Sequence, residues 1–180
     1  MSMTVTIPII SDAHGYGRRA ETILERLERI GEYPRELIFL GDGTRELLQR
    51  LPQELCVYAV RGNCDGFSSF DILDSRGEAI PSERLEIIGG KRILMMHGHE
   101  YSVKSGLALA VNRAVSLEAD ALLFGHTHMP VCEILPKGSV VGGRSLDKAL
   151  HVFNPGALIE GSFGILTVRD RELILSHGRV

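Results

Sequence analysis

The sequence predicts an α/β fold, a four-layer α/β/β/α sandwich in which helices flank two mixed β-sheets packed face to face. Three features of the chain lead to this expectation. Over the first two thirds, short apolar runs alternate with amphipathic helical segments. Over the last third, short apolar runs follow one another across Gly, Pro and Asp-Arg turns, which is typical of antiparallel strands. Several apolar runs also end in a small polar cluster beside a glycine, and loops of that kind carry function in layered α/β folds.

The first apolar run, Val5–Ile10, predicts a buried strand close to the start of the chain. Pro8 lies inside this run and has no backbone donor, so we expect an edge strand or a locally irregular one. The segment Arg18–Ile30 then places apolar side chains at helical spacing with charged side chains opposite them, and Gly31 suits a helix end. The predicted order is therefore strand, polar loop and helix.

The same order occurs a second time. Glu36–Leu40 predicts a strand, and Thr44–Arg50 predicts a short helix that its own first residue is able to cap. A third strand is expected at Leu55–Val60. Arg84–Ile88 and Arg92–Met96 flank a Gly-Gly pair, which predicts a β-hairpin.

The remaining segments are shorter. Phe67–Ser82 has no clear period and is expected to be a loop with one short strand. Leu107–Leu117 carries a helical apolar stripe, and Ala121–Phe124 predicts a buried strand. Four further strands are expected at Val131–Leu135, Ala149–Phe153, Gly164–Val168 and Glu172–Ser176. The glycine-containing segment Pro136–Asp147 between the first two of these is expected to be a mobile loop.

Length and composition indicate one domain over residues 1–180, with a core that needs no disulfide bonds. The net charge of −3 comes without a cluster of Lys and Arg, so a nucleic-acid polymer is not expected as a partner. Cys56, Cys64 and Cys132 form no disulfide pattern, which favours a reducing compartment. Because neither a signal peptide nor a membrane-spanning run is found, we expect a cytoplasmic protein without membrane contact.

Polar side chains with metal-binding chemistry follow the apolar runs within a few residues. They are Asp12, His14, Asp42, Asn63, His97, His99, His126 and His128. Oxygen and imidazole ligands without thiolates suit divalent ions such as Mn²⁺, Fe²⁺, Ni²⁺ or Zn²⁺. These groups are too many for one ion. If the loops meet, two ions roughly 3.5–4 Å apart that share one carboxylate form the site of a two-metal phosphoester enzyme.

These residues occur in an ordered series of motifs. The series consists of Asp12-Ala13-His14, Gly41-Asp42, Gly62-Asn63, His97 and Gly125-His126-Thr127-His128. In this series the chain resembles the calcineurin-like metallophosphoesterase superfamily. Its short length and its Gly-Asn-Cys-Asp form resemble the YfcE-type phosphodiesterase branch. The resemblance extends from Val5 to about Gly161 and implies the sandwich fold as well as the activity.

The resemblance also implies a role for each residue. Asp12, His14 and His128 would hold the first metal ion, Asn63, His97 and His126 the second, and Asp42 would bridge the two. A hydroxide between the ions would attack phosphorus, which implies a dinuclear, metal-dependent phosphodiesterase. Mn²⁺ is the first choice of metal, with Ni²⁺, Fe²⁺ and Zn²⁺ as alternatives. A small phosphoester is the expected substrate, and the catalytic set would be Asp42, Asn63, Cys64 and His99.

Cys64 departs from the family pattern, because many relatives carry a histidine there that protonates the leaving group. A thiol is a weak hydrogen-bonding group, so we expect a preference for activated phosphodiesters. Cys64 also suits the part of a small buried apolar residue. His99 is expected to support a ligand, to face substrate or to be solvated, and it competes with His97 for one ligand position.

Other interpretations stay open at this stage. The same core serves phosphomonoesterases and dinucleoside polyphosphate hydrolases, and a subunit of the retromer coat uses it as a non-catalytic binding scaffold. Exposed strands in the last third suggest a homo-oligomer. Asp65 is expected to support a ligand or simply to lie in a turn, Asn154-Pro155-Gly156 is expected to be a tight turn, and His177 is expected to be solvated.

Overall fold

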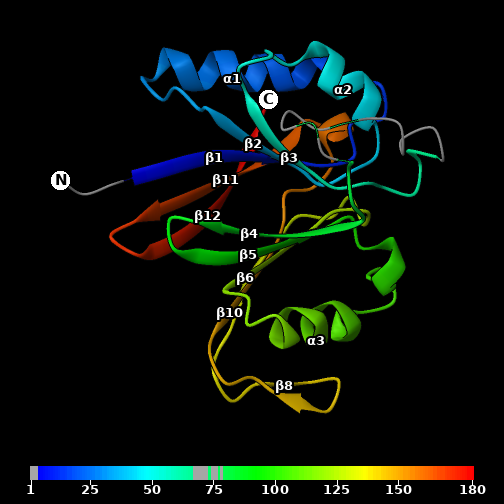
Figure 1. The fold of residues 1–180 in the computed structure, drawn as a ribbon, viewed down its shortest axis with the longest axis vertical. Coiled ribbons are helices and arrows are strands. Elements are labelled where there is room, and N and C mark those ends of the chain that lie inside the picture. Colours follow the sequence, from blue (N-terminus) through cyan, green and yellow to red (C-terminus); the bar gives the residue numbers. More distant parts are fainter. Residues whose placement is uncertain (1–3, 67–72, 74–76, 78) are drawn as a thin grey trace.

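The computed structural model describes residues 4–66, 73, 77 and 79–180, and the ribbon shows four layers (Figure 1). Two five-stranded sheets form the two inner layers, as the sequence predicts. Most of the expected loop from Phe67 to Ser82 lies outside the described residues. Within that segment, Leu73 and Ala79 form an isolated antiparallel bridge.

The first sheet has the strand order β12-β11-β1-β2-β3. Its strands are β1 (Thr4–Ile10), β2 (Glu36–Phe39), β3 (Cys56–Ala59), β11 (Ser162–Arg169) and β12 (Glu172–Arg179). The strands β1, β2 and β3 run parallel, β11 pairs antiparallel with β1, and β12 pairs antiparallel with β11 at the edge. The sheet is therefore mixed, and its parallel half carries the polar loops.

The second sheet has the order β4-β5-β6-β10-β7. Its strands are β4 (Glu83–Ile88), β5 (Lys91–Met96), β6 (Ala121–Phe124), β7 (Val131–Leu135) and β10 (Leu150–Asn154). Here β5, β6 and β10 run parallel, while β4 and β7 are antiparallel edge strands. The hairpin across the Gly-Gly turn is present as β4 and β5, which confirms that prediction.

Helices form the two outer layers (Figure 1). They are α1 (Arg18–Arg29), α2 (Thr44–Arg50) and α3 (Ala108–Ser116), with short 3₁₀ turns η2 (His99–Tyr101) and η3 (Leu158–Glu160). The buried side chains of α1 and α2 pack on the first sheet, and those of α3 pack on the second. A third cluster of apolar side chains fills the space between the sheets. The four predicted layers are thus confirmed. Among the described residues, no helix combines the length and the apolar character needed to cross a membrane.

Two local expectations need correction. The segment Pro136–Asp147 contains a short hairpin, β8 (Val140–Val141) paired with β9 (Arg144–Ser145), and Leu146 beside it is buried in the α3 core. Pro8 lies in a strand between two neighbours, not in an edge strand. The described pairing of β1 with β2 begins only at Ile9, so the missing donor of Pro8 interrupts no pairing on that side.

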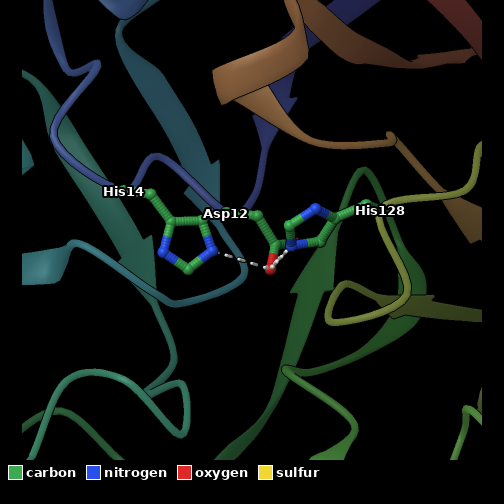
Figure 2. Close-up of side chains that lie close together, drawn as sticks. All are labelled: Asp12, His14 and His128. Carbon is green, nitrogen blue, oxygen red and sulfur yellow. Dashed lines mark ion pairs between the residues drawn. The ribbon is translucent and has the colours of Figure 1, made fainter.

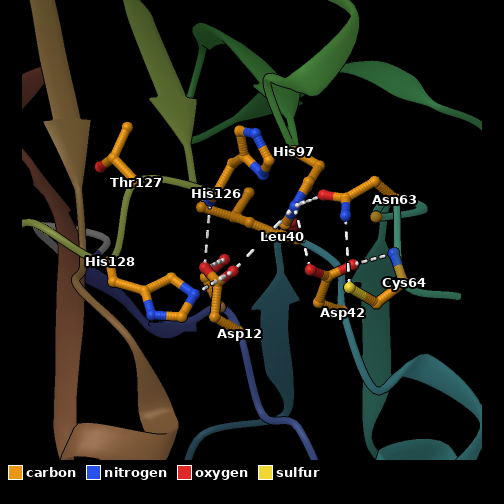
Figure 3. Close-up of polar contacts among 12 residues, drawn as sticks. Asp12, Leu40, Asp42, Asn63, Cys64, His97, His126, Thr127 and His128 are labelled. Carbon is orange, nitrogen blue, oxygen red and sulfur yellow. Dashed lines mark hydrogen bonds and ion pairs between the residues drawn. The ribbon is translucent and has the colours of Figure 1, made fainter. Parts of the chain in front are cut away.

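The direction of the parallel strands positions the site. The strands β1, β2 and β3 of one sheet and β5, β6 and β10 of the other all end toward the same rim of the sandwich, where their polar loops gather (Figures 1 and 3). The carboxyl ends of parallel strands are the usual place for ligands in layered α/β folds.

Candidate metal centre

The loop after β1 contributes a buried carboxylate with two imidazoles beside it (Figure 2). Asp12 is fully buried, and its Oδ1 lies 3.2 Å from His128 Nε2 and 3.8 Å from His14 Nε2. The other oxygen, Oδ2, accepts hydrogen bonds from Ser11 Oγ at 2.6 Å and from the His126 amide at 3.1 Å. One carboxylate oxygen is therefore held by the protein, and the other faces the imidazoles.

The loops after β2, β3 and β5 build the adjoining group (Figure 3). His97 is fully buried, and its Nε2 lies 3.3 Å from Asp42 Oδ2 and 3.1 Å from Asn63 Oδ1. The Nδ1 of the same ring lies 2.7 Å from the carbonyl oxygen of Leu40, which fixes the ring orientation. The Cys64 amide donates to Asp42 Oδ1 at 2.7 Å, so Oδ2 is the oxygen directed at the imidazoles.

The two groups adjoin one another through shared neighbours. His14 Nε2 lies 3.7 Å from Asp42 Oδ2 and 3.8 Å from Asp12 Oδ1. His97 Nε2 lies 4.0 Å from Asp12 Oδ1 as well as 3.3 Å from Asp42 Oδ2. Two buried carboxylates from different strands thus face the same imidazole nitrogens.

The remaining predicted residues lie around this pair of groups. The His126 ring centroid is 5.0 Å from that of His97, and the His99 ring centroid is 5.4 Å from that of His97. His99 begins η2, and its Nδ1 is buried without a hydrogen-bond partner among the described residues. Cys64 is exposed, and its Sγ lies 3.2 Å from Asn63 Nδ2. The structure therefore brings all eight predicted polar residues and Cys64 into one neighbourhood.

The backbone of these loops is unusual. Five of the predicted ligands have positive φ angles, which side chains other than glycine rarely adopt: Asp12 (53°), His14 (41°), Asp42 (65°), His126 (65°) and His128 (61°). Conformations of this kind cost free energy and cluster at functional sites. The repeated use of the left-handed region lets short loops direct several side chains toward one point.

Two glycines allow these loops to approach each other closely. A Cβ atom on Gly62 would lie 2.0 Å from Asp42 Oδ1, and one on Gly125 would lie 2.0 Å from Ser11 Oγ. Any side chain at either position would displace a predicted ligand or the hydroxyl group that holds one. Steric crowding therefore explains why the Gly-Asn and Gly-His motifs contain glycine.

Buried charge shifts the proton affinity of the site residues. Burial on its own would raise the pKa of Asp42, but the hydrogen bond and the charge of His97 outweigh it and lower that pKa. Burial on its own would lower the pKa of His97, but Asp42 and then Asp12 outweigh it and raise that pKa. Burial, together with the charge on His97, lowers the pKa of both His99 and His126. The Asp42 carboxylate is thus held ionised, and two of the imidazoles are biased toward the neutral form that binds metals.

The residues present fit a divalent metal ion. Asp12 Oδ1 is a buried carboxylate oxygen with no hydrogen-bond partner in the described part of the chain. A buried anionic oxygen without a hydrogen bond is costly, and a cation among the surrounding imidazoles would satisfy it. Three sets of ligand atoms lie close enough to hold an ion: Asp12 with His14 and His128, Asp12 with Asp42 and His97, and His14 with Asp42 and Cys64.

Two further side chains, Asp65 and Asn154, hold the loops of the site through hydrogen bonds. The Asp65 carboxylate lies under the loop of Asp42, where it accepts several hydrogen bonds from backbone amides. Asn154 is buried, and its Nδ2 donates to the Gly125 carbonyl oxygen at 2.9 Å and to Thr127 Oγ1 at 3.1 Å. Asn154 ends the strand β10, which runs parallel to β6 and β5, and those two strands also end in the site.

The tight turn expected at Asn154-Pro155-Gly156 is present, since Gly156 N donates to Asn154 Oδ1 at 2.8 Å. That turn also holds the loop of the two C-terminal motif histidines. His177 is exposed, as expected, but it also contacts this turn: its Nε2 lies 2.7 Å from the Asn154 carbonyl oxygen and its ring stacks on Phe153.

Residues 5–178 match the calcineurin-like phosphoesterase superfamily domain. "Probable metallophosphoesterase YsnB" of Bacillus subtilis is 34% identical over 131 residues, which cover 73% of this chain and 69% of that protein. "Phosphodiesterase YfcE" of Escherichia coli K12 is 27% identical, with 91% of this chain and 92% of that protein covered.

Solved structures give the same fold. A predicted phosphoesterase from Streptococcus pneumoniae has a TM-score of 0.69 at 20% identity, covering 98% of this chain and 90% of that one. Vacuolar Protein Sorting 29 from Cryptosporidium parvum has a TM-score of 0.63 at 17% identity, with 98% of each chain covered. At these identities the likeness concerns the fold.

Proposed function

Because the chain belongs to the calcineurin-like phosphoesterase superfamily, and so is a metallophosphoesterase, we propose that it is a phosphodiesterase using two divalent metal ions. One observation carries the proposal. The free oxygens of two buried carboxylates, Asp12 Oδ1 and Asp42 Oδ2, face the same imidazole nitrogens. A single ion would leave several of the surrounding ligand atoms unused, whereas two ions sharing Asp42 would use them all.

The family pattern assigns the ligands. Asp12, His14 and His128 would hold one ion, Asn63, His97 and His126 the other, and Asp42 both. Oxygen and imidazole ligands suit Mn²⁺ first and Ni²⁺, Fe²⁺ or Zn²⁺ as alternatives. When bound, such a pair lowers the pKa of a water molecule and stabilises the charge that develops on a phosphoryl group.

The chain's own residues orient this centre. The Leu40 carbonyl oxygen fixes the ring of His97, and the Cys64 amide fixes the carboxylate of Asp42. Cys64, exposed at the rim, places a thiol where substrate would arrive. A thiol is a weak hydrogen-bond donor and would assist an alkoxide leaving group little, so the preferred substrates would be small phosphodiesters with good leaving groups.

Replacing the bridging residue tests the proposal. We expect purified protein to bind Mn²⁺, Ni²⁺ or Zn²⁺ and to hydrolyse bis-p-nitrophenyl phosphate with at least one of them. D42A should lose activity by roughly a hundredfold or more, because both ions lose a shared ligand. D147N alters an exposed carboxylate that belongs to none of the three possible ligand sets, and it should keep the parent rate. A parent protein that binds no transition metal, or a D42A variant with the parent rate, would contradict the proposal.

A binding scaffold is the second candidate function, because the fold neighbours include Vacuolar Protein Sorting 29. The presence of competent ligands at all seven matched positions favours the enzyme. Activity on p-nitrophenyl phosphate or on a dinucleoside polyphosphate, compared with the diester, would identify the other hydrolase classes. Homo-oligomerisation and a cytoplasmic location stay predictions from the sequence.

A further inference from the structure

The carboxylate of Asp65 accepts an unusually large number of hydrogen bonds. Its Oδ1 accepts from the amides of Gly43 and Thr44, both at 2.8 Å. Its Oδ2 accepts from the amide of Asp42 at 3.0 Å, the amide of Gly62 at 2.7 Å and the hydroxyl of Thr44 at 2.7 Å. One side chain thus joins the loop after β2 to the loop after β3.

The backbone of the Asp42 loop explains why an anion belongs there. Asp42 and Gly43 have φ angles of 65° and 104°, and with Thr44 they direct three successive amides to one point. Successive amides in such conformations form a concave, anion-binding nest. The helix α2 begins at this nest and has no capping side chain of its own, so Asp65 also satisfies amides at the start of the helix.

The contact between the two loops is reciprocal. The side chain of Asp65 holds the backbone of Asp42, and the side chain of Asp42 accepts from the backbone amide of Cys64. Asn63, the only other predicted ligand on these two loops, lies between the residues that make these contacts. Any loosening of this contact would therefore displace two predicted metal ligands together.

We propose that Asp65 is a positioning residue of the metal centre, whose carboxylate holds the Asp42 and Asn63 loops in their ligand-presenting conformation. The proposal rests on the proposed function, since it concerns the same metal ligands. An asparagine at this position would keep the shape of the side chain but not its chemistry. Each carboxylate oxygen accepts from at least two donors. In either orientation of the side-chain amide of D65N, its NH₂ group would therefore face hydrogen-bond donors and could not accept from them.

The test compares D65N with a matched carboxylate elsewhere. Asp120 also accepts a backbone hydrogen bond, from Arg92 N at 2.8 Å, but it lies at the opposite end of the sheet, just before β6. Titration calorimetry with Mn²⁺ well below the unfolding temperature should show affinity weakened by about 10- to 100-fold in D65N. D120N should lose stability and keep the parent affinity for Mn²⁺.

Chemical rescue distinguishes this role from a general contribution to stability, which an added small anion would not restore. D65A leaves the nest without its anion, and sodium formate should partly restore Mn²⁺ affinity, whereas sodium chloride at the same concentration should not. Folded D65N with the parent affinity for Mn²⁺ would overturn the inference.

Amide hydrogen exchange of the metal-free proteins separates this inference from the proposed function. D65N should lose protection at Asp42, Gly43, Thr44 and Gly62, and retained protection at these amides would also overturn the inference. If the parent binds none of Mn²⁺, Ni²⁺ and Zn²⁺, the proposed dinuclear function fails. Loss of amide protection in D65N would still show that Asp65 holds both loops.

Discussion

The residue after Asn63 is Cys64, at a position where many relatives were expected to carry a histidine. Cys64 is exposed, and its backbone amide donates a hydrogen bond to the Asp42 carboxylate. Partial burial and the adjacent Asp42 carboxylate raise the pKa of the thiol, which makes it a still weaker proton donor. The expectation that Cys64 is a small buried residue is wrong, because its side chain is at the rim.

Replacing this thiol with an imidazole should help poor leaving groups. We expect C64H to raise kcat on an alkyl phosphodiester by about tenfold or more, because a positioned imidazole acts as a general acid near neutral pH. The rate on bis-p-nitrophenyl phosphate should change less, since its leaving group needs little assistance. C64S serves as the control for loss of the thiol. Equal rates of the parent on aryl and alkyl diesters would contradict the premise.

At the scale of elements, hydrogen bonds to the Glu83 carboxylate hold η2 in place. Tyr101, at its end, donates to Glu83 Oε2 at 2.6 Å, and Arg113 of α3 donates to the same carboxylate through Nε at 3.0 Å and through its terminal nitrogen. The Arg113 guanidinium lowers the pKa of Glu83 despite partial burial, and Tyr101 adds to this effect. Partial burial and Glu83 raise the pKa of Tyr101 to about 12, so its phenol stays a donor. The turn that carries His99 is therefore fixed to β4 and α3.

This anchor should depend on pH. The folded pKa of Glu83 lies below the unfolded value of about 4.3, so its contribution is full above that value and is lost as pH falls through the lowered folded pKa. E83Q should lower the Tm by roughly 2–4 °C at pH 7. Thermal unfolding of both proteins from pH 7 to pH 3 should show the difference shrinking below about pH 4. A difference independent of pH would contradict this account.

At the scale of the whole molecule, the site lies across both sheets. Asp12, Asp42 and Asn63 follow strands of the first sheet, whereas His97, His126 and His128 follow strands of the second. Metal ions bound there would link the two sheets at one rim (Figure 3). Because the ligands are assembled only in the folded protein, metal binding would add to the stability of the whole sandwich.

Metal binding should accordingly raise the unfolding temperature. At a Mn²⁺ concentration of about 100 times Kd, one site contributes roughly 2.7 kcal/mol, which corresponds to a rise of about 5–10 °C for a chain of this size. Differential scanning calorimetry should detect the rise, and EDTA should reverse it. D42A should show a smaller shift because it lacks the shared ligand. An unchanged Tm in the parent protein at that concentration would count against a metal centre linking the sheets.

The sequence by itself determined the elements, the layers and the set of polar residues at the rim. Apolar periodicity reports which face of a segment is buried, and this local property was enough to predict β1, α1, α3 and the β4–β5 hairpin. The ordered motifs predicted the family, which the comparisons confirm. The assignment of individual metal ligands stays a prediction.

Only the tertiary structure decided which loops face one another and what holds them. The sequence left Asp65 between a ligand-supporting residue and a turn residue, and it favoured a plain turn at Asn154. Most of the hydrogen-bond partners of Asp65 lie 21 to 23 residues away, and those of the Asn154 side-chain amide lie 27 to 29 residues away. The left-handed φ angles of Asp12, Asp42 and His128 are likewise invisible in the sequence. The physical reason is that hydrogen-bond partners depend on strand order and close loop approach, whereas apolar periodicity records only the burial of each segment.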